Sequence, residues 1–402
     1  MADKKKSGNE KKAREFMPQL ASELKKRFGD QGEPRFFRAP GRVDWLGSHT
    51  DYNQGLILAS TVDREIIVAA RLRNDGALNC YSLNLDLEVR ASLKKNLPDS
   101  AHGFANYPKG VLNELAGAGV ILPGIDMVFY GDIPIGANLS SSAAIEAATI
   151  EAALGLADSP MTHWQRAFVC WRAETNFVGL PCGILDQFTI INAKKDCALY
   201  LDCDTLASEL IPFTFDEYYL LVIDSGVGRH LVKSEYSKRV EECRAAYSQL
   251  RKSGYTIASL SKIEPWQLPE IEPKLEPVLF KRTRHIVTEN QRVSAARKVV
   301  SKKDFERLGS IFEEGYRSCR DDYENSSPEL DILHNLLASA PGVTGTRVAG
   351  AGWGGCLVSL IKNVDYQKIE AAVGAKYTEK TGKKLRFFPV ETGEAPGEII
   401  IA

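Results

Sequence analysis

The sequence lacks an excess of charge of either sign. Its 51 lysine and arginine residues are balanced by 52 aspartate and glutamate residues, which leaves a formal net charge of −1. Proteins that bind nucleic acid or an anionic membrane surface generally carry a strongly basic field. The balance therefore argues against both kinds of partner and favours a small-molecule substrate.

Long apolar runs and cysteine motifs are also missing. No apolar run approaches the ~20 residues of a membrane-spanning helix, and we expect no signal peptide. The eight cysteines form no Cys-x-x-Cys pair and lie near no histidine cluster, so neither a zinc site nor a dithiol motif is predicted. We expect reduced thiols in a cytoplasmic protein, which is a monomer or a small homo-oligomer.

The length of the chain predicts more than one domain. With 402 residues, of which 44% are hydrophobic, the chain exceeds an average domain. We expect a flexible tail over residues 1–12, an N-terminal domain over 13–205 and a C-terminal domain over 206–402, although composition marks this boundary weakly. Apolar residues at helical spacing predict a first helix over 12–28, and residues 55–72 predict one or two strands.

A phosphate-binding loop is one interpretation of residues 131–144. The loop follows a strand-like segment at 125–130 and leads into an alanine-rich stretch, 143–154, with high helix propensity. Gly136 and Asn138 tolerate the positive φ angles of a tight turn. The chain thus has a strand, a loop and a helix in succession.

The three serines that follow place hydroxyls and capping groups at the start of this helix. Ser140, Ser141 and Ser142 stand where free N–H groups and the helix dipole attract anions. The pattern is neither a Walker A loop nor a dinucleotide motif. The residues alone leave two interpretations open: a phosphate site, or a serine-capped helix packed on a sheet.

A second loop is dense in side chains that bind hydroxyl groups. Arg42, Ser48, His49, Asp51 and Asn53 lie within a dozen residues. A sugar site needs such planar and acidic groups, because each hydroxyl asks for a matched donor or acceptor. By composition alone, a solvated turn is the simpler interpretation.

Two further segments carry candidate functional residues. A helix predicted over 164–174 is broken by two glycines and a proline at 177–188, which puts Asp186 on a constrained loop or at a helix start. This carboxylate is either a helix-capping anion or a general base. Near the end, five glycines stand between two β-branched segments at 342–360, which indicates tight turns or close backbone approach to another group.

These pieces, in this order, resemble the galactokinase group of the GHMP kinase superfamily. The segments 41–55, 134–144 and 345–356 are similar to its three motifs, and further similarity covers most of the chain. The resemblance implies a two-domain α/β (α+β) fold in which mixed sheets pack against helices and the active site lies in the cleft between domains. It also implies that the γ-phosphoryl group of MgATP is transferred to the anomeric hydroxyl of a sugar.

The resemblance also assigns residues to roles. It implies that Asp186 is the catalytic base and that Arg42 is the cation beside it. It implies that the sugar site includes Ser48, His49, Asp51, Gly183 and Tyr236. It further implies that ATP is held by Phe104, which takes the place of an aromatic residue on the adenine, and by Gly136, Asn138, Ser140 and Ser141, and that Mg²⁺ is held by Ser142 and Glu174.

Some positions depart from the family pattern. Ser48 stands where a glutamate usually receives the hydroxyl at the C6 end of the sugar, and Asp44 stands where asparagine is common. Ala137, Asn138 and Ala351 replace glycines. Galactose is therefore the default substrate, and a C6-variant sugar such as galacturonate, arabinose or fucose is the main alternative. A non-catalytic regulator that binds sugar and ATP is another, whereas a mevalonate or homoserine kinase is disfavoured.

Overall fold

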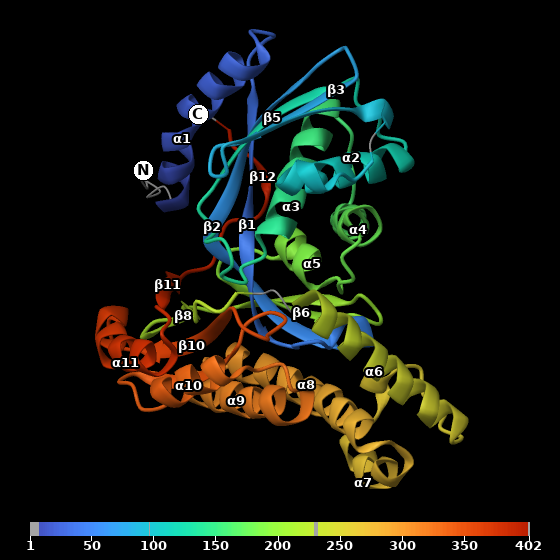
Figure 1. Ribbon diagram of the computed structural model, residues 1–402, viewed down its shortest axis with the longest axis vertical. Coiled ribbons are helices and arrows are strands. Elements are labelled where there is room, and N and C mark those ends of the chain that lie inside the picture. Colours follow the sequence, from blue (N-terminus) through green and yellow to red (C-terminus); the bar gives the residue numbers. More distant parts are fainter. Residues whose placement is uncertain (1–7, 96, 229–231, 401–402) are drawn as a thin grey trace.

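The computed structural model describes residues 8–95, 97–228 and 232–400, which form two sheets and the helices packed on them (Figure 1). Within these residues the first sheet has eight strands and the second has four. The first sheet contains β1 (Arg35–Leu46), β2 (Leu56–Leu72), β3 (Ala77–Ser82), β4 (Leu87–Ser92), β5 (Ile125–Gly131), β6 (Cys197–Asp202), β7 (Ser208–Pro212) and β12 (Gly397–Glu398). The second contains β8 (Tyr218–Asp224), β9 (Val343–Val348), β10 (Cys356–Lys362) and β11 (Arg386–Val390).

The helices surround both sheets. They are α1 (Gly8–Phe28), α2 (Asn106–Gly117), α3 (Ser141–Ala157), α4 (His163–Arg172), α5 (Leu185–Asn192), α6 (Val232–Lys252), α7 (Leu268–Ile271), α8 (Pro277–Ser301), α9 (Phe305–Ser318), α10 (Pro328–Leu337) and α11 (Tyr366–Thr381). In Figure 1, α1 covers one face of the first sheet, and α2, α3, α4 and α5 gather on the other. Helices α9, α10 and α11 pack on the second sheet.

The first sheet is organised around β2, which is one continuous strand of 17 residues. Its first residues pair with β6, its last residues pair with β5, and β1 runs antiparallel along it. The strand order is β12-β1-β2-β5-β3-β4, and β3 with β5 is a parallel pair. The second sheet is antiparallel throughout, in the order β11-β8-β10-β9.

Several sequence expectations match this architecture and others need correction. The first helix ends at Phe28 as expected but begins at Gly8, so residues 8–12 of the expected tail are helical and residues 1–7 lie outside the described residues. The glycine-rich stretch at 342–360 does lie between two strands, β9 and β10. Within the described residues, no helix is both long and apolar enough to cross a membrane. The eight cysteines all lie in the described ranges and are free thiols.

The changeover between the two sheets lies later than the expected boundary at 205/206. That boundary falls inside the hairpin of β6 and β7, both of which belong to the first sheet. By sheet membership the changeover lies between Pro212 and Tyr218. Composition could not reveal this, because β7 is a short and mostly exposed edge strand.

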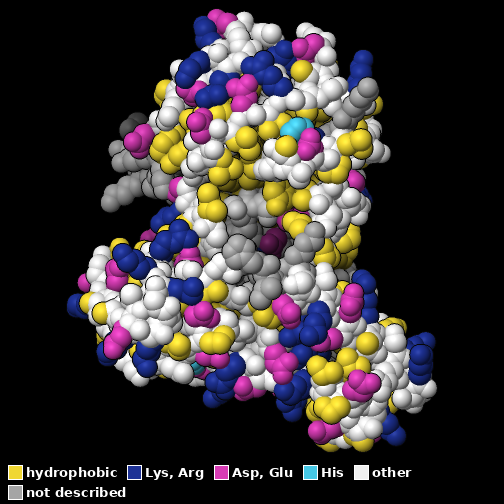
Figure 2. Space-filling model, in the orientation of Figure 1, with side chains coloured by type: hydrophobic (Ala, Val, Ile, Leu, Met, Phe, Trp, Pro, Cys, Tyr) yellow, Lys and Arg dark blue, Asp and Glu magenta, His cyan; other side chains and the backbone are white. Residues whose placement is uncertain are grey.

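The two parts also share apolar packing. One cluster of buried side chains joins residues of the first sheet, such as Trp45, to Phe213 beyond β7 and to Phe312 on α9. The rings of Trp45 and Phe213 pack edge to face, with ring centroids 4.8 Å apart. The face drawn in Figure 2 carries basic and acidic side chains side by side on both parts, in keeping with the balanced net charge.

We predict that Gly309→Ala lowers the free energy of unfolding by about 1–3 kcal/mol, because overpacking strains a close contact. Helix α9 touches β9 at this glycine, and an added Cβ would lie 2.5 Å from the carbonyl oxygen of Thr344. The matched control is Gly374→Ala in α11, where the nearest atom lies 4.0 Å away. There alanine should raise stability by up to about 1 kcal/mol through helix propensity. Urea unfolding of both variants checks this, and equal effects would contradict it.

Candidate active site

A cavity of about 400 Å³ brings together thirteen of the fourteen residues that the sequence assigned to the site. They are Arg42, Ser48, His49, Asp51, Gly136, Asn138, Ser140, Ser141, Ser142, Glu174, Gly183, Asp186 and Tyr236. The size suits a small-molecule site. The residues come from β1 and the loop after it, from the loop before α3 and the start of that helix, from the helical turn Ala173–Val178, from the loop before α5 and the start of that helix, and from α6.

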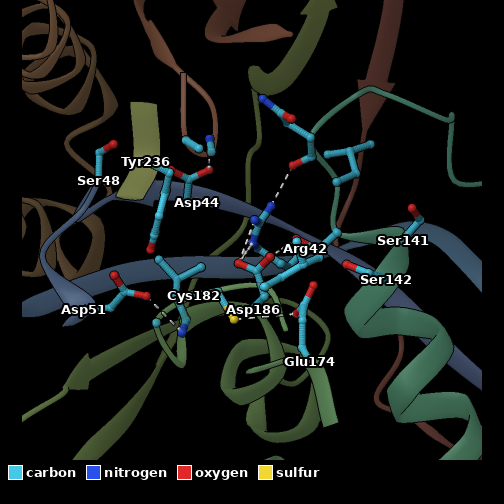
Figure 3. A pocket seen from close by; sticks show the side chains of 18 of the residues that line it. Arg42, Asp44, Ser48, Asp51, Ser141, Ser142, Glu174, Cys182, Asp186 and Tyr236 are labelled. Atoms are coloured by element: carbon cyan, nitrogen blue, oxygen red, sulfur yellow. Dashed lines mark hydrogen bonds and ion pairs between the residues drawn. The ribbon is translucent and has the colours of Figure 1, made fainter. Parts of the chain in front are cut away.

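An ion pair between Arg42 and Asp186 lies at the centre of the cavity (Figure 3). Both Nε and Nη2 of Arg42, on β1, lie 2.7 Å from Oδ1 of Asp186. Asp186 is the second residue of α5, where the helix dipole favours an anion. Burial opposes the charge of Arg42, but Asp186 and Asp44 raise its pKa above the ordinary value. The cavity thus holds a permanent cation beside a carboxylate.

The loop before α3 adopts left-handed backbone at alternate residues. Gly136, Asn138 and Ser140 have φ angles of 85°, 58° and 56°. The backbone oxygen of Asn138 accepts a hydrogen bond of 2.7 Å from Nη1 of Arg42. Among the described residues, Ser140 precedes α3 without a side-chain capping bond, and its hydroxyl donates instead to Oδ2 of Asp186 at 2.5 Å. The expectation that the serines cap α3 is therefore wrong for the side chain of Ser140. Its hydrogen bond instead connects this loop to the Arg42–Asp186 pair.

Two buried carboxyl groups lie behind this pair. Glu174 lies beside the Ser142 hydroxyl, and burial together with Asp186 raises the pKa of its carboxyl to about 7. Nε2 of Gln187 donates to Glu174 at 2.5 Å and to Glu146 at 3.0 Å. Sequence reasoning missed Gln187 and Glu146. Their spacing was a usable signal, because Glu146 follows Ser142 by four residues on one helix face and Gln187 follows Asp186 directly.

The oxygens of Ser142 and Glu174 fit a magnesium ion in chemical type. Magnesium is usually held by one or two carboxylates together with phosphate oxygens. No cluster of three or more His, Cys, Asp or Glu side chains suited to a metal occurs in the described ranges. The described residues therefore contain no metal site built entirely from such side chains. Two protein oxygens suit a magnesium ion that takes its other ligands from a nucleotide.

At the other end of the cavity, Asp51 is held by backbone donors. Its Oδ1 accepts from the N–H of Tyr52 at 2.9 Å and its Oδ2 from that of Leu185 at 3.4 Å. Gly183 passes so close that an added Cβ would lie 1.7 Å from Oδ2 of Asp51. Burial, with a contribution from Asp186, raises the pKa of Asp51 to about 6. Tyr236 from α6 lines the same end (Figure 3).

The ring of His49 is used within the protein. Its Nε2 lies 2.9 Å from the carbonyl oxygen of Ala351, to which it donates, and its Nδ1 lies 2.9 Å from the hydroxyl of Tyr52. Burial lowers the pKa of His49 to about 3, so the ring is neutral at neutral pH. His49 lines the cavity, but its ring holds the loop after β1 to the glycine-rich loop after β9 instead of presenting a free nitrogen.

Ser48 is held through its backbone. Its N–H and that of Gly47 donate to Glu289 at 3.3 and 2.8 Å, and its carbonyl accepts from His285 at 3.0 Å. The hydroxyl of Ser48 is buried and makes no hydrogen bond of normal geometry to the described residues. No local pattern around Ser48 indicates a contact with Glu289, which lies more than 200 positions away. Burial opposes its charge, but Arg292 and Arg347 lower the pKa of Glu289 to about 2.

Phe104 is the one assigned residue that the structure does not bring to the cavity. Its ring is buried and meets Phe129 edge to face, with ring centroids 5.8 Å apart. It belongs to the main apolar cluster of the first sheet. Its contact with adenine stays a prediction.

Comparison with known proteins places the chain first in a class. The N-terminal domain of GHMP kinases matches residues 106–194, and the C-terminal domain of GHMP kinases matches residues 294–379. A mevalonate kinase from Methanococcus jannaschii shares the fold, with a TM-score of 0.64 and 16% identity over 90% of this chain and 99% of that one. The chain is a GHMP kinase with the two-domain fold of that superfamily.

Within this class the chain belongs to the galactokinase family. The galactokinase galactose-binding signature matches residues 22–72. The galactokinase of Halalkalibacterium halodurans is 36% identical over 90% of this chain and 92% of its own length, and that of Clostridium acetobutylicum is 37% identical over 90% and 94%. The structure of Lactococcus lactis galactokinase complexed with galactose matches with a TM-score of 0.91 and 30% identity, over 95% of this chain and all of that one.

The raised pKa of Asp51 predicts how sugar affinity changes with pH. The carboxyl is ionised above about pH 6 and protonated below it. Protonation would remove one acceptor for the sugar hydroxyl that Asp51 is expected to bind. We expect the dissociation constant of the sugar to rise about fourfold between pH 7.5 and 5.5, in proportion to the lost ionised fraction. Calorimetric titration measures it. Asp51→Asn should bind weakly and without this pH dependence, and a flat profile for the wild type would contradict the assignment.

Proposed function

We propose that the chain transfers the γ-phosphoryl group of ATP to the anomeric hydroxyl of galactose. The observation that carries this proposal is the Arg42–Asp186 pair, which stands where the helix-start loop at 136–140 meets the hydroxyl-binding loop at 48–51. A phosphate donor on one side and a sugar on the other would both face the same carboxylate. The membership of the galactokinase family supports the same reaction.

In this proposal Asp186 accepts the proton of the sugar hydroxyl as the oxygen attacks the γ-phosphorus, and the bond from that phosphorus to the bridging oxygen breaks so that ADP leaves. Arg42 pairs with this carboxylate and faces the negative charge that develops during transfer. Ser140 and Ser141, with the free N–H groups of α3, bind phosphate oxygens. The reaction needs positioning and charge neutralisation more than covalent help. Ser142 and Glu174 would hold Mg²⁺, which supplies charge neutralisation at the phosphates when bound.

We propose that Asp51, Tyr236 and the backbone of Gly183 bind sugar hydroxyls. Because Gly183 has no side chain, the carboxylate of Asp51 has room beside it. The ring of Tyr236 is half-buried, and its removal from water raises the pKa of the phenol, so the hydroxyl stays neutral and able to donate. We further propose that the enzyme works in the cytoplasm, where its nucleotide substrate is found.

Ser48 supports a second candidate substrate, a neutral sugar of the same configuration without a hydroxyl at C6. Its short, uncharged side chain leaves no carboxylate to receive that hydroxyl. L-Arabinose and D-fucose fit this description. Galacturonate fits poorly, because Arg42 is the only arginine or lysine among the described residues that line the cavity, and it is paired with Asp186. An added carboxylate there would lack a cation.

The reading as a non-catalytic regulator is weaker. Asp186 is paired with Arg42 and bonded to Ser140, so the groups that a phosphoryl transfer requires stand together. A regulator needs sugar and nucleotide sites but not a carboxylate at their meeting point. Release of ADP that depends on sugar separates the two functions directly.

We predict that Asp186→Asn lowers kcat by about 10²–10⁴-fold, the usual contribution of a general base. Asparagine keeps the shape of the side chain but cannot accept the proton, so the dissociation constants of sugar and ATP should change little. Coupled ADP release and calorimetry measure the two effects. The matched control is Asp216→Asn on an exposed loop. Turnover that survives in Asp186→Asn would exclude this residue as the base.

We predict that the wild type discriminates D-galactose from D-fucose and L-arabinose by less than about 100-fold in kcat/KM, because no charged acceptor faces C6. Ser48→Glu should increase the preference for galactose, whereas Ser48→Gln, of similar size, should increase it less. ADP release with each sugar, and with galacturonate and N-acetylgalactosamine, measures this. An unmoved preference in Ser48→Glu would show that Ser48 does not select the sugar, and inactivity on the whole panel would reject the kinase proposal.

A further inference from the structure

One peptide group of the glycine-rich loop is held from both ends by side chains of the first sheet and its phosphate loop. Nδ2 of Asn138 donates to the carbonyl oxygen of Ala349 at 2.7 Å. The N–H of Gly350 donates to Oδ1 of Asp44 at 2.9 Å. This oxygen and this N–H belong to the same peptide bond.

Both side chains are built into this contact. Asp44 is 2% exposed and Asn138 is 6% exposed, so water has little access to either side chain. The space for Asn138 exists because Gly350 and Gly355 have no side chains. A Cβ on these residues would lie 3.3 and 2.7 Å from the amide group of Asn138. Asp44 has a nearby cation as well, since Nη2 of Arg347 lies 3.5 Å from its Oδ2.

The contact is linked to the reacting groups through Asn138. The backbone oxygen of the same residue accepts a bond of 2.7 Å from Arg42, and Arg42 pairs with Asp186. The conformation of Asn138 is therefore fixed at its side chain by the second part of the chain and at its backbone by the ion pair. A glycine at this position would keep the left-handed backbone at φ 58° but could not make the side-chain bond.

We propose that Asp44 and Asn138 act together as a clamp on the peptide group between Ala349 and Gly350, and that this peptide clamp positions the phosphate loop against Arg42 and Asp186. The proposal rests on the proposed function for its catalytic consequence, but not for the clamp itself. Asn138 and Asp44 are positioning residues in this role, because they act through Arg42 and through the backbone of the two loops. Asn138 serves the nucleotide site by placing the loop.

The test replaces the side chain without changing the backbone preference. Asn138→Gly removes the amide, and Asn363→Gly is the matched control, since Asn363 also has a left-handed φ of 50° but is exposed on the far loop after β10. Hydrogen exchange of peptides that cover residues 345–356 is measured without substrates. We expect exchange at Gly350 to rise about tenfold in Asn138→Gly, as the loss of one hydrogen bond allows, and to stay unchanged in Asn363→Gly.

Kinetics then test the consequence for catalysis. We expect kcat/KM for ATP to fall about tenfold in Asn138→Gly, because a displaced phosphate loop costs orientation, while the dissociation constant of the sugar stays within about twofold. Asp44→Ala should raise exchange in the same segment, and the double variant should add little to either single change, because both side chains hold one peptide.

The outcomes separate the clamp from the reaction. If Asn138→Gly behaves like Asn363→Gly in exchange and in kinetics, the proposal is overturned. If Asn138→Gly does not fold, an unchanged exchange rate in Asp44→Ala overturns it. If exchange rises as expected in a chain that phosphorylates no sugar, the clamp stands and the proposed function fails.

Discussion

The active site depends on one buried guanidinium group. Arg42 is almost wholly removed from water, so its charge is stable only while other groups supply compensating contacts. Those contacts come from Asp186 at the start of α5 and from the carbonyl of Asn138 in the loop before α3. Removing one partner would leave a buried charge uncompensated, which costs far more than the lost bond alone. The cation therefore fixes the mutual positions of a strand, a loop and a helix start.

Around this pair, burial divides the acidic side chains into two groups. Asp51 and Glu174 lie near the carboxylate of Asp186 and neither forms an ion pair with a described residue, so burial raises the pKa of each, to about 6 and about 7. Glu289 is fully buried, but Arg292 and Arg347 reverse the effect of burial and lower its pKa to about 2. The pKa values of the first group thus lie closer to neutral pH than those of ordinary carboxyl groups. The second is a fixed anion that orders the backbone under Ser48.

The sequence predicted much of this site because its motifs are local. The loop before α3 and the loop after β1 each carry their residues within about a dozen positions, and thirteen of the assigned residues do line one cavity. What the sequence could not predict depends on distant contacts. One such contact is the hydrogen bond from the ring of His49 to the carbonyl oxygen of Ala351, which lies some 300 positions away, and the role of His49 in binding sugar stays a prediction. The serines were expected to cap α3, but the hydroxyl of Ser140 donates its hydrogen bond to Asp186 instead.

The fold was predictable in kind but not in its boundary. Alternating and β-branched segments indicated the strands, yet no local pattern shows which sheet a short edge strand such as β7 will join. From the sequence, the second sheet could be predicted only to follow the first along the chain. Phe104 shows the same limit for a single residue, because an aromatic ring suits a core and a ligand site equally well.

The return of the chain to its first sheet has a consequence for synthesis. Residues near 391–398 come back from the second sheet, where Glu391 bonds with Asp63, Gly393 lies against Val62 and β12 pairs with the edge of β1. A ribosome produces β1 more than 350 residues before β12. Until residues 397–398 have been made, the edge of β1 at Phe37 and Arg38 therefore lacks its partner strand, and an unpaired strand edge can pair with another chain.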